Sequence, residues 1–131
     1  TNASQAIMRI LDFYEEGERD SIRRALATNL RAIISQRLVR RSSGGEVVPA
    51  MEIMINTPIV KRLLFDGRLE KLPQAIETGD HDGMMTFNQS LLRLIQGGMI
   101  SEASGMDAST RPEQLKMNLK GVFLSSGGIV G

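Results

Sequence analysis

The stretch NTPIVKRLLFDG, residues 56–67, constrains the fold most, because it marks both ends of one short helix. Asn56 or Thr57 can accept hydrogen bonds from the first free backbone N–H groups, and Pro58 has the fixed backbone angle of a first helical position. Gly67 supplies the left-handed residue that often ends a helix. Between these residues lie more apolar side chains than a short surface helix needs, which raises the question of what covers them.

Other segments of the chain also show helical spacing of their apolar residues. Glycines and polar caps separate them, and Thr86 with Gln89, like Thr110 with Glu113, has the spacing of a capping box. The pattern predicts helices over residues 3–14, 18–30, 68–79, 86–98 and 110–122.

Two segments in the first half of the chain have the composition of strands. Residues 31–41 are rich in β-branched residues and leucine, and residues 46–55 alternate two sets of side chains. The SSGG loop at 42–45 fits a hairpin between them, and Pro49 places the second strand at an edge or a bulge. The sequence therefore predicts an α/β fold.

Composition narrows the function more by exclusion than by direct indication. The chain of 131 residues suits one domain, and 16 Lys and Arg against 15 Asp and Glu leave a net charge of +1, which gives no global attraction for nucleic acid. The lack of cysteine excludes disulfides and fits a reducing compartment. No apolar run is long enough to span a membrane. We therefore expect a cytoplasmic protein with neither a nucleic-acid partner nor direct membrane insertion.

Motifs that carry chemistry are missing from this chain. It has no G-x-x-x-x-G-K-[ST] phosphate loop, so nucleotide hydrolysis cannot be complete in these residues. Its one histidine, His81, lies between Asp80 and Asp82, a pattern that more often forms a solvated turn than a metal site. We expect no catalytic residue and no bound metal in this chain. The basic cluster of the first strand allows two interpretations, a solvated rim or an anion contact: Arg31, Arg37, Arg40 and Arg41.

Four stretches of the sequence together resemble a known family in the right order. They are TNASQAIMRILDFY, SQRLVRR, EIMINTPIVKRLLFDG and GMMTFNQSLLRLIQGGMIS, and they are similar to the C-terminal half of the pilus retraction ATPases of twitching motility, the PilT-like branch of the secretion ATPases. The resemblance implies the C-terminal part of a RecA-like ATPase core over 1–55, a helical subdomain over 56–122 and a flexible tail over 123–131. It also implies that the phosphate loop and the acidic boxes lie upstream of these residues.

The resemblance assigns two sets of residues in this chain. Thr1 and Asn2 fall on the end of the family's histidine box, and with Ser35, Gln36 and Arg37 they are the residues expected near the nucleotide. The family's retraction motif, Ala-Ile-Arg-Asn-Leu-Ile-Arg-Glu, departs here at its fourth and seventh positions, where arginine and phenylalanine stand. In this chain the motif falls on Ile59, Val60, Lys61, Arg62, Leu63, Leu64, Phe65 and Asp66.

The function that the resemblance implies belongs to a larger assembly. Members are homohexameric motors that use ATP and Mg, lie in the cytoplasm at the inner-membrane platform of a type IV pilus, and drive pilus retraction. Residues 59–66 would provide subunit contacts and coupling, with Arg62 and Phe65 facing outward, whereas no nucleotide would bind to this chain alone. The plainer alternative for the apolar residues is a core role.

Two other functions remain open from the sequence. One is a stand-alone α/β module that binds a partner protein through its apolar helix. The other is part of a pilus-assembly or type II secretion ATPase, although such motors usually carry a metal-binding cysteine cluster that this sequence lacks.

Overall fold

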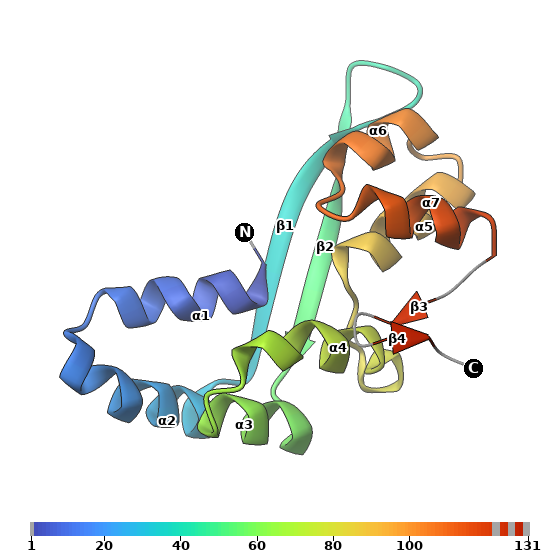
Figure 1. The fold of residues 1–131 in the computed structure, drawn as a ribbon. Coiled ribbons are helices and arrows are strands. Elements are labelled where there is room, and N and C mark those ends of the chain that lie inside the picture. Colours follow the sequence, from blue (N-terminus) through green and yellow to red (C-terminus); the bar gives the residue numbers. More distant parts are fainter. Residues whose placement is uncertain (1, 122–123, 126–127, 130–131) are drawn as a thin grey trace.

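A long β-hairpin runs through the molecule (Figure 1). The structure, a computed structural model, describes residues 2–121, 124–125 and 128–129. Strand β1 (Ala32–Arg40) pairs antiparallel with β2 (Val47–Ile55), from Ala32 opposite Ile55 to Arg40 opposite Val47. Pro49 is tolerated because β2 is an edge strand, apart from one bridge between Ile53 and Met85.

Helices precede and follow this hairpin, so the predicted α/β fold, with helices around a hairpin, is confirmed. Helix α6 was not predicted, because its seven residues contain few apolar side chains. The α-helices are α1 (Ala3–Asp12), α2 (Arg19–Asn29), α3 (Pro58–Phe65), α4 (Leu72–Glu77), α5 (Phe87–Gln96), α6 (Glu102–Ala108) and α7 (Pro112–Leu119), and the short 3-10 turns are η1 (Glu16–Glu18), η2 (Leu69–Lys71) and η3 (Asp80–Asp82).

Helices α1, α3 and α5 begin where the polar caps predict. The side chains of Asn2 and Thr86 both form capping boxes, and Thr57 accepts a hydrogen bond from the Val60 N–H at the start of α3. The capping box predicted at Thr110 is wrong. Helix α7 begins one residue later, with Arg111 at the cap position and no side-chain hydrogen bond there.

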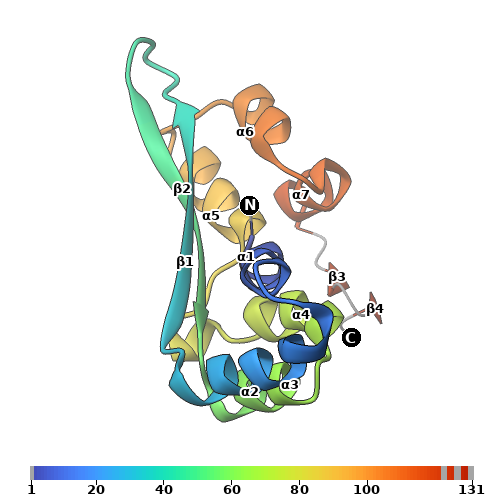
Figure 2. The same ribbon diagram turned by 90° about the vertical axis from the view of Figure 1, so that its left-hand side faces the viewer.

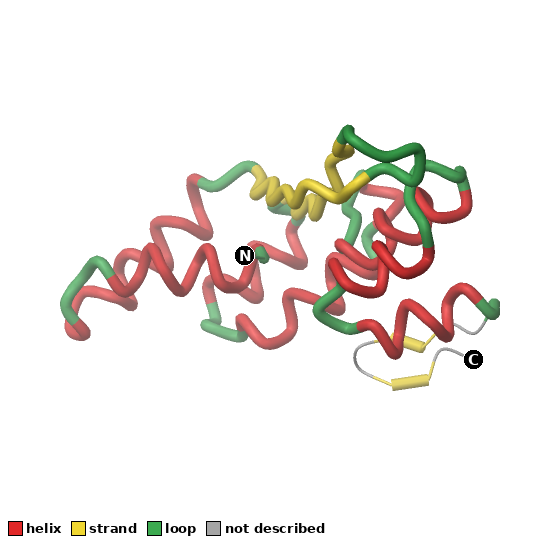
Figure 3. The backbone as a smooth tube through the Cα atoms, turned by 90° about the horizontal axis from the view of Figure 1, so that it is seen from above, coloured by secondary structure: helices red, strands yellow, loops and turns green. Residues whose placement is uncertain are grey.

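The buried side chains form two clusters, which follow two groups of helices joined by the hairpin (Figure 3). The first cluster contains residues of α1, α2, α3, α4 and the end of β2, so it crosses the boundary predicted at residue 56. The second joins the far end of the hairpin to α5, α6 and α7. Division of the chain into two domains at that boundary remains a prediction.

The two faces of the hairpin differ sharply. Helices cover one face, where Val39, Val48, Ala50 and Met54 are buried (Figure 2). On the opposite face Ile34, Leu38 and Val47 are more than half exposed. Strand alternation predicts the two sets of side chains, but only the packing shows which set is inside.

The end of the chain forms a second, very short antiparallel pair. Its strands are β3 (Leu124–Ser125) and β4 (Gly128–Ile129). The rest of the tail predicted over 123–131 lies outside the described residues, and its flexibility remains a prediction.

Candidate functional site

Helix α3, which carries the stretch assigned to the retraction motif, divides its apolar residues between two environments. Val60 and Leu64 are completely buried in the first cluster, and Leu63 packs against that cluster while half-buried. Ile59 is 68% exposed and Phe65 is 48% exposed. The helix therefore has a core face and a second face with large apolar side chains in contact with solvent.

Charged groups surround this exposed face of α3. The Arg62 Nε donates to the Asp66 Oδ2 at 3.1 Å, one turn along the helix. The guanidinium of Arg24, from α2, lies over the Phe65 ring, 5.6 Å from its centroid. Arg62 and Phe65 both face outward, which gives the exposed face guanidinium groups beside an aromatic ring, the residue types that are enriched at protein interfaces.

Arg23 of α2 lies at the C-terminal end of α3. Helical spacing in residues 18–30 would place Arg23 away from the apolar stripe that includes Ile22 and Leu26, yet its side chain is only 15% exposed. Its Nε donates to the Leu64 carbonyl at 3.0 Å and its Nη2 to the Phe65 carbonyl at 3.3 Å. The last carbonyls of a helix have no N–H partner within the helix. The Arg23 side chain turns inward because it supplies hydrogen-bond donors to these carbonyls of α3.

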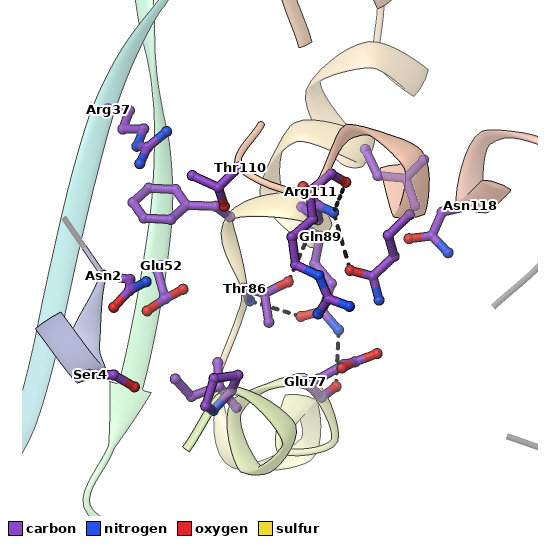
Figure 4. A pocket seen from close by; sticks show the side chains of 16 residues that line it. Asn2, Ser4, Arg37, Glu52, Glu77, Thr86, Gln89, Thr110, Arg111 and Asn118 are labelled. Carbon is purple, nitrogen blue, oxygen red and sulfur yellow. Dashed lines mark hydrogen bonds between the residues drawn. The ribbon is translucent and has the colours of Figure 1, made fainter. Parts of the chain in front are cut away.

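A cavity of about 230 Å³ lies between the start of α1, the covered face of the hairpin, α4, α5 and α7 (Figure 4). Apolar side chains and a rim of carboxamides and hydroxyls line it together. Much of the polar rim is committed to internal bonds: Gln89 takes part in the Thr86 cap and donates to the Glu77 carbonyl, and Asn88 donates to the Arg111 carbonyl.

The carboxylate of Glu52 is a buried charged group that lines this cavity. Its Oε1 accepts a hydrogen bond from the Ala3 N–H at 2.9 Å, so one side chain of β2 holds the first residue of α1. Burial raises the pKa of Glu52, against the lowering effects of the Ala3 and Phe87 N–H groups and of the Arg37 charge. The sequence did not single out Glu52, although it is the one charged residue of β2.

Arg37 also lines the cavity and is held there by two contacts. Its guanidinium lies 5.0 Å from the centroid of the Phe87 ring, and its Nη1 donates to the Ala108 carbonyl at 2.8 Å. The basic cluster expected on β1 is thus divided. Arg31 and Arg40 are exposed, and Arg41 pairs with Glu46 at 3.8 Å near the loop of the hairpin.

The structure brings together only part of the set expected near a nucleotide. Asn2 and Arg37 line the same cavity. Ser35 is not among its lining residues, and Gln36 lies on the opposite face of the hairpin because side chains alternate along β1. Thr1 lies outside the described residues.

Neither a metal centre nor a spanning helix is present in the described part of the chain. No group of three potential metal-ligating side chains is found among residues 2–121 and the short tail pair. His81 is exposed in η3, with its ring nitrogens 4.0 Å from Asp80 Oδ1 and 3.4 Å from Asp82 Oδ2. Over the same residues, none of the helices combines the length and apolar character needed to cross a bilayer.

Known proteins similar to this chain include a pilus retraction ATPase. The type IV pilus retraction ATPase PilT of Pseudomonas aeruginosa strain PAO1 is 34% identical over 113 residues, which make up 86% of this chain and 33% of that protein. The solved structure of the pilus retraction motor PilT with bound ADP matches 88% of this chain and 32% of that chain, with a TM-score of 0.73 and 32% identity. This chain is homologous to the pilus retraction ATPases.

A second relative agrees with this assignment to the retraction ATPases. A twitching motility protein of Neisseria gonorrhoeae is 30% identical over 115 residues, which make up 88% of this chain and 31% of that protein. No family model matches the chain. The chain spans about a third of the length of the curated relatives it matches. The family expected from the four sequence stretches is therefore confirmed.

Proposed function

We propose that this chain is part of a hexameric, ATP-driven motor that powers type IV pilus retraction, and that its residues supply contacts and coupling. Homology to pilus retraction ATPases over most of the chain supports the motor. The absence of a phosphate loop from the sequence supports a role apart from the phosphate site. The motor would use ATP with Mg and work in the cytoplasm, bound at the inner-membrane platform of the pilus.

The observation that carries the coupling role is the divided surface of α3. Ile59 and Phe65 remain exposed, and the Arg24 guanidinium lies over the Phe65 ring, which pairs an arginine with an aromatic side chain, two residue types that are enriched at interfaces. We propose that residues 59–66 use the buried face to attach to the first cluster and the exposed face to contact a neighbouring subunit or domain. A contact that changes with the nucleotide state needs different packing in two states, which an exposed apolar face can supply.

A separate proposal concerns which residues of this chain lie near the nucleotide. Asn2 and Arg37 share the cavity beside the start of α1, and we propose that this side of the hairpin faces the nucleotide pocket. Ser35 lies on the same strand and Thr1 precedes Asn2, so both stay in the set. Gln36 is the member that alternation turns away from it.

The coupling role is tested in the full-length protein that contains this chain. Phe65→Ala and Leu63→Ala are each expected to uncouple retraction from ATP turnover, because each removes apolar surface from the motif helix without touching the proposed nucleotide side. Val47→Ala, at an exposed apolar residue of the hairpin, is the matched control. The measurements are pilus retraction speed in cells and ATP hydrolysis by the purified protein.

Two results would count against this function. Normal retraction by both α3 variants would remove the coupling role. Loss of folding by both variants would assign the helix to the core alone, since large-to-small changes in a core cost ~2–5 kcal/mol.

A further inference from the structure

Helices α2 and α3 form an antiparallel pair whose two ends are both tied by side-chain hydrogen bonds. We propose that Arg23 is the positioning residue of α3: it locks α3 to α2, so that the two helices move as one body and deliver a displacement of the core to the exposed face of α3. This inference rests on the proposed coupling function and adds to it a residue outside residues 59–66.

The first tie is at the C-terminal end of α3. Arg23 donates to the carbonyls of Leu64 and Phe65, and the Leu64 carbonyl also accepts the Gly67 N–H at 3.2 Å. Arg23 is held from its other side by Asp20, whose carboxylate accepts a 2.6 Å hydrogen bond from Nη1. A planar guanidinium with its donors placed on three acceptors has little freedom to move.

The second tie is at the opposite end of the same pair. Asn56, just before the cap of α3, donates from its side-chain nitrogen to the carbonyls of Ala27 at 3.0 Å and Leu30 at 2.7 Å, at the end of α2. Its backbone N–H donates to the Arg31 carbonyl at 2.9 Å. Both termini of α3 are thus fixed to α2 or to the residues that follow it.

Apolar packing fills the space between the two ties. Ala27 of α2 and both Val60 and Leu64 of α3 are completely buried in one cluster. Arg24, the neighbour of Arg23, lies over the ring of Phe65 and limits where that exposed ring can point. A well-packed pair that is hydrogen-bonded at both ends resists sliding and tilting, so α3 cannot respond to the core separately from α2.

A distance measurement tests the lock directly. The chain has no cysteine, so cysteines introduced at the exposed Ser21 of α2 and Lys61 of α3 give a defined pair of spin-labelling sites in the full-length protein, once any cysteine elsewhere is replaced. The original protein is expected to give one narrow distance distribution. Arg23→Met keeps the stem of the side chain, loses all three donors, and is expected to broaden that distribution.

The functional readout uses the same Arg23→Met change without the labels. Retraction is expected to be lost while ATP turnover is unchanged, a split that a loss of stability alone would not produce. Arg9→Met, at an exposed arginine of α1, is the control for loss of one positive charge. A narrow distribution in Arg23→Met, or normal retraction despite a broad one, would overturn the proposal, and so would an equal fall of ATP turnover and retraction.

A variant that fails to fold does not leave the question open. If Arg23→Met is unfolded, Arg23→Lys replaces it, because lysine keeps the charge but has a single donor group. Its label distances, retraction and ATP turnover are measured, and the outcomes given for Arg23→Met decide in the same way. If that variant is unfolded as well, Arg23 serves stability and the lock is overturned. Failure of the coupling function itself is recognised separately, since Phe65→Ala would then retract normally whatever the label distances show.

Discussion

Helices α3 and α5 begin alike and end in different surroundings. Both start with a threonine cap, and both end next to a glycine in the left-handed region, Gly67 after α3 and Gly98 after α5. The apolar residues of α5 all pack in or against the second cluster, whereas α3 leaves Ile59 exposed. Similar start and stop residues therefore do not imply similar burial of the apolar side chains. Of these two helices, only α3 has apolar surface that the core does not cover.

The largest change in the free energy of unfolding is expected from substitution of the buried leucines, which the two helices have in common. Leu64→Ala and Leu91→Ala each create a cavity in a closely packed cluster and should each lower the free energy of unfolding by ~2–5 kcal/mol. Ile59→Ala truncates an apolar side chain of similar size that is exposed to solvent. This change should alter the free energy of unfolding by less than about 0.5 kcal/mol. Chemical denaturation measures all three, and a large loss for Ile59→Ala would mean that its exposed face is part of the core.

The next largest effect on stability is expected from alanine substitution of the glycines that follow the two helices, and its size should differ between them. Both require a left-handed backbone, so alanine at either position should cost about 1 kcal/mol in unfolding free energy. A Cβ at Gly67 would also meet the Arg23 guanidinium at 3.3 Å, whereas a Cβ at Gly98 would meet no atom. Gly67→Ala should therefore be the more destabilising of the two by thermal unfolding, and equal losses would show that the guanidinium gives way.

Removal of the threonine caps should lower the stability by a smaller amount, and by different amounts for the two helices. Thr86 and Gln89 form a reciprocal box with bonds of 3.1 and 3.0 Å, whereas Thr57 accepts one longer bond of 3.4 Å. Thr86→Ala is expected to cost about 1 kcal/mol in unfolding free energy, and Thr57→Ala less. The same denaturation curves measure both, and a larger loss at Thr57 would reverse this ranking of the caps.

A pH dependence is expected where the buried Glu52 of β2 accepts a hydrogen bond from the start of α1. Because burial raises the pKa of this carboxyl in the folded state, the folded protein holds the proton more tightly than the unfolded chain does. The contribution of Glu52 to stability is thus full below the ordinary carboxyl pKa and is lost as the pH rises through the raised value. Glu52→Gln should flatten this fall in a series of unfolding curves, and an unchanged slope would assign it to other groups.

Short-range signals in the sequence account for the local structure of this protein. The starts of α1, α3 and α5 follow from polar atoms that satisfy N–H groups no more than three residues away. The hairpin follows in the same way from alternation and a glycine turn. Helix α6 and the start of α7 were missed because their signals are short: a Ser101 cap on a helix with little apolar pattern, and a threonine that does not cap.

Long-range packing determines which faces are covered and which polar side chains turn inward. Arg23 reaches a carbonyl 41 residues further along the chain, and Glu52 reaches an N–H group 49 residues before it. Periodicity identifies the faces of a helix or strand, but the covering elements come from distant segments. The burial of a guanidinium or a carboxylate depends on partners that no local pattern contains, because desolvation of a charge is tolerated only where the fold supplies its hydrogen bonds.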